Sequence, residues 1–128
     1  MKSGEQTRLK FATITALEEE AIYEFVIDDG AELDGNDFDS INHFLNSQGS
    51  NTAALVNKIN QYTLGFDFQV KMHTSGYFIA CAIVERSPSM AKINKMVLET
   101  PRPKKINACQ FYDYDEAVNW LKHELAKA

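Results

Sequence analysis

The hydrophobic pattern of the chain centres on one uninterrupted apolar run. Residues Tyr77–Val84 contain no charged residue and no Gly or Pro, a pattern typical of a strand that is buried on both faces. Ser87 and Pro88 follow closely, and a hydroxyl at the N-cap with proline at the first helical position predicts that a helix begins there. Apolar residues at helical spacing continue to Leu98. A central strand that leads into a helix is a basic unit of a layered α/β fold.

The first half of the chain predicts a hairpin, a helix and a further strand. An alternating pattern over residues 7–17 predicts one strand, and β-branched and aromatic residues over 21–27 predict a second that pairs with it. The glutamates Glu18–Glu20 between them are interpreted as a solvated turn. Apolar residues at helical spacing from Asp37 to Asn46, after an acidic start, predict an amphipathic helix. Residues 52–59 then predict a third strand.

Residues 62–76 fit two patterns. Phe66, Phe68, Val70 and Met72 alternate with polar residues, as in a strand. The same four residues also form two pairs that are four apart, as on a helix, so periodicity alone leaves residues 66–73 open. We expect a helix here, because apolar strands lie on both sides and parallel strands need a crossover, which is usually helical.

The last part of the chain predicts a short strand and a closing helix. Pro101 and Pro103 are expected to end the helix that begins at Pro88. Residues 106–112 predict a strand. Asp113 and Glu116 then have the spacing of an N-cap residue and the N3 residue of a capping box, which predicts a C-terminal helix.

The order of predicted elements is β-β-α-β-α-β-α-β-α. We therefore expect an α/β fold with a mixed five-stranded sheet that opens with a β-hairpin and continues with right-handed crossovers. Residues 1–128 are expected to form a single domain, with residues 1–7 as a flexible N-terminus.

Composition restricts the classes of partner. The 128 residues carry a formal net charge of −5, which disfavours nucleic acid and anionic membranes as general partners. No stretch approaches the roughly 20 apolar residues of a transmembrane helix, so no stable membrane insertion is expected. Cys81 and Cys109 lie in apolar runs and are interpreted as buried free thiols rather than a disulfide. A cytoplasmic location follows as the default expectation.

Four segments together resemble a known family. They are Asp28–Leu33, Phe78–Pro88, Pro101–Pro103 and Phe111–Leu121. They are similar to small bacterial proteins of the SpoIIAA-like group, which have the STAS fold of anti-sigma-factor antagonists and are related in shape to lipid-binding SEC14 domains. The resemblance follows the order of elements over residues 8–126, and residue similarity lies in the second half. It implies a STAS-type fold and a regulatory role through protein–protein contact.

The signalling members of this family carry a phosphorylated serine in an Asp-x-Ser-Gly turn after the third strand. The corresponding stretch here, Asn60–Gly65, contains no serine, and Thr63 lies nearest to the phosphoacceptor position. Thr63 is interpreted either as a phosphoacceptor or as the N-cap of the next helix, and the second interpretation is favoured.

The sequence contains no recognisable catalytic or metal-binding motif. His43, His73 and His123 lack the spacing of zinc ligands, and no nucleophile elbow or phosphate-binding glycine loop is present. We therefore predict no catalytic residue, no metal site and no cofactor.

Binding residues are expected where the predicted strands end. In open α/β sheets, ligands and partners meet the carboxyl ends of the strands. Ser87 at a helix N-terminus beside Arg86 suggests a weak anion site, although a capping serine with a solvated arginine explains the same residues. The candidate partner- or ligand-facing residues are Tyr62, Thr63, Leu64, Gly65, Glu85, Arg86 and Ser87.

Two functions are the leading hypotheses from the sequence, and an enzyme is the third and weakest. The first is a non-catalytic regulatory module that binds an unidentified protein partner or forms a homodimer. The alternative is a SEC14-like protein that binds a small apolar or lipid ligand, with an anionic ligand also considered. An apolar cavity of some hundreds of Å³ would favour the ligand-binding alternative, whereas a solid core with an exposed apolar patch would favour the contact module.

Overall fold

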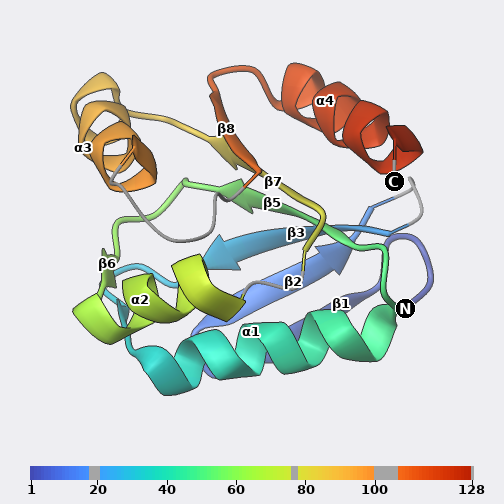
Figure 1. The fold of residues 1–128 in the computed structure, drawn as a ribbon, viewed down its shortest axis with the longest axis horizontal. Coiled ribbons are helices and arrows are strands. Elements are labelled where there is room, and N and C mark those ends of the chain that lie inside the picture. The colour runs from blue at the N-terminus through green and yellow to red at the C-terminus, as the bar shows by residue number, and fades with distance from the viewer. Residues whose placement is uncertain (18–20, 76–77, 100–106, 128) are drawn as a thin grey trace.

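The computed structural model describes residues 1–17, 21–75, 78–99 and 107–127 (Figure 1). Its strands and helices alternate over most of the chain, as the hydrophobic pattern predicts. The elements are β1 (Gln6–Leu9), β2 (Ala12–Ala16), β3 (Ile22–Ile27), β4 (Glu32–Leu33), α1 (Gly35–Gln48), β5 (Ala53–Asn57), β6 (Thr63–Leu64), α2 (Phe66–Ser75), β7 (Ala80–Val84), α3 (Pro88–Glu99), β8 (Ala108–Phe111) and α4 (Tyr114–Lys127).

Within the described residues, the main sheet is mixed and has six strands in the order β1-β2-β3-β5-β7-β8. The first three strands are antiparallel, and β3, β5, β7 and β8 are parallel neighbours. The helices α1, α2 and α3 are the crossovers between successive parallel strands. The prediction of an α/β fold with a mixed sheet and four helices is confirmed.

The predicted number of strands was wrong. Residues 7–17 form two strands rather than one, because the chain turns at Lys10 and Phe11 so that Leu9 pairs with Ala12. The turn contains no Gly, Pro, Asn or Asp, and the alternating pattern runs through it, so the sequence carries no sign of it. The short parallel pair of β4 and β6 was also missed, because two-residue strands have no measurable period.

The helices follow their capping signals. In α1 the Asp34 side chain accepts a hydrogen bond from the backbone of Asp37, and the Asp37 side chain accepts one from the backbone of Asp34. This capping box starts the helix two residues before the predicted position. The ambiguous residues 66–73 lie within helix α2, which confirms the crossover argument. In α4 the backbone N–H of Glu116 donates to Oδ1 of Asp113, as predicted.

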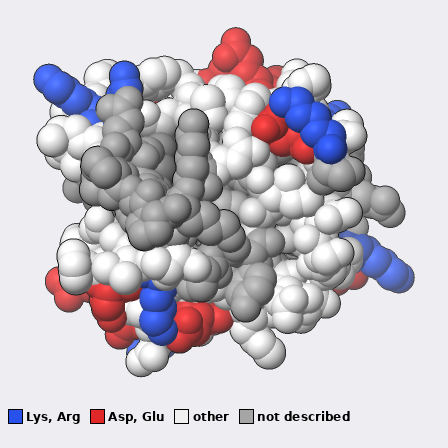
Figure 2. Space-filling view, in the orientation of Figure 1, with Lys and Arg blue, Asp and Glu red and all other residues white. Residues whose placement is uncertain are grey.

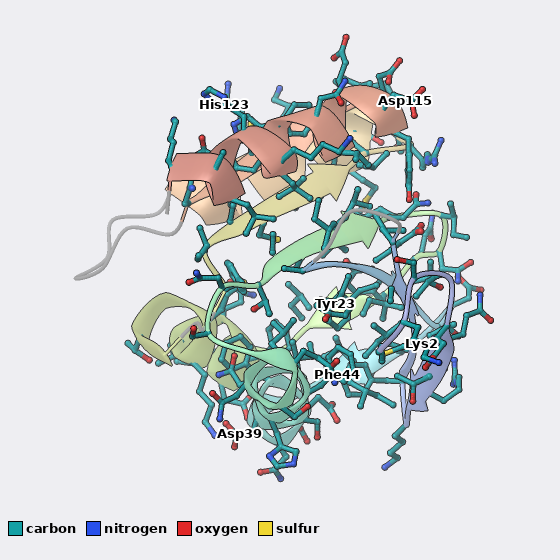
Figure 3. All side chains as sticks on the ribbon, turned by 90° about the vertical axis from the view of Figure 1, so that its right-hand side faces the viewer. Lys2, Tyr23, Asp39, Phe44, Asp115 and His123 are labelled. Carbon is teal, nitrogen blue, oxygen red and sulfur yellow. The ribbon has the colours of Figure 1, made fainter. Side chains whose placement is uncertain are left out.

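The sheet separates two apolar layers. One face packs against α1, and Figure 3 shows Tyr23 and Phe44 between the sheet and this helix, where their rings meet edge to face with centroids 5.5 Å apart. The other face packs against α4 through residues such as Leu55 and Leu121, which are fully buried. Asp115 and His123 lie on the outward side of α4 (Figure 3).

The two cysteines lie on opposite faces of the sheet. Cys81 packs in the cluster beneath α1, whereas Cys109 pairs with Ala82, whose side chain faces α4. Both thiols are free, as predicted, and Cys81 is buried, but Cys109 is only half-buried, so the predicted burial of Cys109 was wrong.

Several sequence expectations concern the chain ends and segments outside the described residues. Gln6 and Thr7, expected in a flexible N-terminus, pair in β1 with Thr15 and Ile14. The segments at Glu18–Glu20 and at residues 100–106, with the predicted helix-ending prolines, lie outside the described residues. Among the helices that are described, none is long and apolar enough to cross a membrane.

Candidate functional site

A hollow of about 350 Å³ lies between the sheet and helices α1, α2 and α3. Its floor is formed by inward side chains of three adjacent strands, and its walls by apolar side chains of the three helices. The floor residues are Phe25, Ile27, Ala54, Val56, Cys81 and Ile83, and the helical wall residues are Phe38, Ile41, Phe68, Met72, Met90 and Ile93. We call this hollow the main cavity.

The strand register explains the apolar floor. Phe25, Val56 and Ile83 are paired across β3, β5 and β7, so their side chains form one row on the same face. Alternate residues of a strand point to opposite faces. The residues between them, such as Leu55 and Ala82, therefore face α4 and belong to the other apolar layer.

One side of the main cavity is fixed by contacts between α1 and α2. The rings of Phe38 and Phe68 meet edge to face with centroids 5.1 Å apart. The Lys71 ammonium lies 2.6 Å from the Asp39 carboxylate. The backbone N–H of Gly35 donates to Oδ2 of Asp67 over 2.8 Å. Together these contacts hold α2 against the start of α1.

Gly65 allows a close approach on the same side. Its backbone N–H donates to the carbonyl oxygen of Leu33 over 2.8 Å. A Cβ atom at this position would lie only 2.9 Å from that oxygen. The β4–β6 pair, which leads into α2, therefore requires glycine at residue 65.

The opposite side of the main cavity is formed by α3. The Gln110 side-chain amide donates to the Ala91 carbonyl oxygen over 2.8 Å and to Oε1 of Glu85 over 3.1 Å, which links the helix to the sheet. Ile93 lines the cavity but is 53% exposed. The main cavity therefore opens to solvent beside α3.

On the face shown in Figure 2, basic and acidic side chains lie side by side over α1 and α2.

The polar end of the main cavity carries Lys58. The Lys58 Nζ atom lies 4.8 Å from the centre of the Tyr62 ring, in a cation–π contact. Among the described residues, no hydrogen-bond or ion-pair partner of the Lys58 ammonium is found. Burial lowers the pKa of Lys58, and the charge of Glu85 opposes this shift. Burial also raises the pKa of Tyr62.

The Cys81 thiol belongs to the floor of the main cavity. Burial raises its pKa to about 12, and the nearby Lys58 ammonium acts in the opposite direction. A thiol with such a pKa is protonated at neutral pH and is therefore a poor nucleophile.

A smaller hollow of about 130 Å³ adjoins the polar end. It brings together two of the stretches that the sequence analysis singled out, because Tyr62 lines it together with Glu85, Arg86 and Ser87. Lys58 and Tyr62 line both hollows. Thr63 and Leu64 line the main cavity instead, and Gly65 lines neither hollow but forms the contact with Leu33.

The side chains of Arg86 and Ser87 have partners within the protein. The Arg86 guanidinium donates to Oδ1 of Asn57 over 3.0 Å. The Ser87 hydroxyl accepts a hydrogen bond from the backbone N–H of Met90 over 3.4 Å, at the start of α3. This is the capping role that the sequence predicts.

Thr63 does not cap a helix. It lies in β6, paired with Glu32, and α2 begins three residues later at Phe66. The favoured interpretation of Thr63 as an N-cap was therefore wrong, because Gly65 directly precedes the helix.

Lys58 was not recognised as a site residue from the sequence. The sequence pattern that could have identified it is the two-residue period of a strand. Ala54, Val56 and Lys58 are each two residues apart, and all three line the main cavity. In the sequence, Lys58 lies near the end of the strand predicted over residues 52–59, where a polar residue is ordinary. Among the described residues, no group of three His, Cys, Asp or Glu side chains is placed to hold a metal ion.

Comparisons with known proteins returned no match. No family model matches the chain, and no match was found among curated proteins or among solved structures. The resemblance to SpoIIAA-like proteins therefore stays a prediction from the sequence.

Proposed function

We propose that the protein binds a small ligand whose apolar part occupies the main cavity. The observation that carries this proposal is a hollow of about 350 Å³ whose lining is almost entirely apolar. Ligand sites are typically concave, mostly apolar hollows of roughly 300–1,000 Å³ with a few polar groups. The ligand-binding alternative of the sequence analysis thus becomes the leading proposal.

The chemistry of the lining favours an apolar ligand over ordered water. Water can enter the main cavity beside α3, but ordered water in a protein interior needs two to four polar partners. The floor between Phe25 and Ile83 offers none. A ligand that fills this space removes both its own apolar surface and that of the lining from water, which stabilises the complex by about 0.8 kcal/mol per buried methylene.

The volume sets the size of the ligand. An engineered lysozyme cavity of roughly 150 Å³ binds benzene, which has six carbon atoms. By that ratio, a hollow of about 350 Å³ holds on the order of 14 non-hydrogen atoms. A medium-length alkyl chain or a two-ring compound has this size.

A pair of matched variants tests the proposal. Val56→Phe adds a ring to the cavity floor, whereas Val70→Phe makes the same change on α2 at a residue that is 43% exposed and outside the cavity lining. We expect calorimetry to detect binding of 1-decanol to the wild type and to Val70→Phe, and at least tenfold weaker binding to Val56→Phe. Equal affinities in all three proteins would contradict the proposal. Native mass spectrometry of the purified wild type would also report a co-purified ligand.

A second candidate function is the regulatory protein contact expected from the sequence. The observation that favours it is the exposure of Phe66, which is 82% exposed at the start of α2, one turn before Val70. Sedimentation of the wild type and Phe66→Ser tests the homodimer form of this proposal. We expect a concentration-dependent dimer in the wild type and its loss in the variant, and a wild type that stays monomeric would contradict it. We propose a non-catalytic, cytoplasmic role in either case.

A further inference from the structure

We propose that the ligand is an amphipathic monoanion, of the class of medium-chain alkyl carboxylates, and that Lys58 binds its carboxylate. This inference rests on the proposed function, because it assigns the polar end of a ligand whose apolar part occupies the main cavity.

Lys58 is the one charged side chain among the described residues that line the main cavity. It follows Ala54 and Val56 at the spacing that directs side chains to the cavity face. The other polar lining residues include Thr63 and Gln69, and the Gln69 amide already donates to the carbonyl oxygen of Leu64. Recognition of a charged ligand group therefore depends on residue 58.

The Lys58 ammonium forms no ion pair with the described residues, so a ligand can supply its negative partner. A charge that leaves water is costly unless it is paired. In the described part of the chain, the ammonium contacts the Tyr62 ring and forms no ion pair. A carboxylate at the end of the cavity would provide the missing counter-charge and a charge-assisted hydrogen bond.

Glu85 is the internal competitor for Lys58. Its charge favours the ammonium form of Lys58. Its Oε1 atom, however, accepts a hydrogen bond from Gln110, and Glu85 lines only the smaller hollow. Lys58 lines both hollows, so its ammonium can meet a ligand carboxylate in the main cavity while Glu85 remains on the other side.

The charge balance favours a monoanion over a phosphate-type ligand. One lysine faces the cavity, Glu85 lies close to it, and the whole chain has a net charge of −5. Lys58 can neutralise one negative charge of a ligand, so the second charge of a dianion would stay unneutralised and would be repelled by Glu85. The cavity volume of about 350 Å³ matches a carboxylate with an alkyl chain of about ten to twelve carbons.

The test compares two probes of equal chain length, decanoate and 1-decanol, by calorimetry at pH 7. The proteins are the wild type, Lys58→Met, Lys58→Arg and the control Lys92→Met, which removes an exposed positive charge on α3 outside the cavity lining. We expect Lys58→Met to weaken decanoate binding at least tenfold and to change 1-decanol binding less than about twofold. Lys58→Arg should retain most of the affinity for decanoate, and Lys92→Met should change neither affinity.

The outcomes separate the two proposals. If decanoate and 1-decanol bind the wild type and Lys58→Met alike, the inference about Lys58 is overturned and the apolar cavity function stands. If neither probe binds the wild type, the proposed function itself fails, and this inference fails with it.

If Lys58→Met does not fold, decanoate and 1-decanol binding to the wild type over a range of pH tests the inference instead. The groups that face Lys58 are Tyr62, Glu85, Cys81 and Arg86. Decanoate affinity should fall relative to that of 1-decanol as the pH rises and Lys58 loses its proton. A constant ratio of the two affinities up to pH 10.5 would overturn the inference.

Discussion

The buried Cys81 thiol should make the stability of the protein depend on pH above about 9. Cys81 lies on the floor of the main cavity, and burial raises its pKa to about 12 from an ordinary value of 9.0. In the unfolded chain the thiol loses its proton near pH 9, whereas the folded protein retains it. Between these two pKa values the native state therefore binds more protons than the unfolded state, and stability falls as the pH rises.

The size of the effect follows from the width of this interval. One proton difference changes the free energy of unfolding by about 1.4 kcal/mol per pH unit. From pH 8 to pH 10 the Cys81 thiol should thus reduce the stability of the wild type by about 1.4 kcal/mol. The raised pKa of Tyr62 acts in the same direction at higher pH, and the lowered pKa of Lys58 acts in the opposite direction.

A comparison of wild type and Cys81→Ala isolates the thiol. Urea unfolding at pH 8 and pH 10 gives the free energy of unfolding of each protein. The stability lost in the variant through poorer packing is nearly the same at both pH values. The wild type should lose about 1.4 kcal/mol more than Cys81→Ala between pH 8 and pH 10. An equal loss in both proteins would refute the reasoning.

A spectroscopic measurement tests the same pKa directly. The chain contains two cysteines, so Cys109→Ala leaves Cys81 as its one thiol. Thiolate absorbance of folded Cys109→Ala should then rise only as the pH approaches about 12. A rise near pH 9 in the folded protein would show that the thiol is not desolvated.

Three further substitutions and one exposed control test the packing and helix capping of the fold, each by urea unfolding. Gly65→Ala should destabilise the protein by about 1–3 kcal/mol, because the added Cβ would meet the Leu33 carbonyl oxygen; unchanged stability would contradict this close approach. Leu45→Ala should cost about 2–5 kcal/mol, because Leu45 is fully buried, whereas Phe66→Ala at an exposed residue should stay within about 0.5 kcal/mol of the wild type. Asp34→Ala should cost about 1 kcal/mol through loss of the α1 capping box, and wild-type stability would argue against it.

The elements that the sequence predicts well are those with long or chemically distinct local signals. The apolar run before Ser87 gives the buried strand β7, and the Ser87–Pro88 pair marks the start of α3. Residues 66–73 have an ambiguous period, and their helix was predicted from topology, because parallel strands need a crossover.

The features that the sequence does not predict depend on contacts between segments. The turn at Lys10 and Phe11 has no turn residue, and the β4–β6 pair exists because Gly65 lets two distant backbones meet. The cavity is a space between elements, so no residue in isolation predicts it. The role of Lys58 could not be predicted for the same reason. A lysine at a strand end is ordinarily solvated, and only the cavity beside Lys58 makes its charge significant.

The position of the main cavity follows from the topology of the sheet. The successive crossovers from β3 to β5, β7 and β8 place α1, α2 and α3 on the same face. Contacts such as Phe38–Phe68 hold α1 and α2 together, whereas α3 is linked to the sheet through Gln110. The parallel strands end between the α1–α2 pair on one side and α3 on the other, and the space at their carboxyl ends therefore stays open. The ligand proposed here therefore occupies a gap that the crossover order creates, and Lys58 lies at its polar end because it directly follows β5, the middle one of the three strands that form the cavity floor.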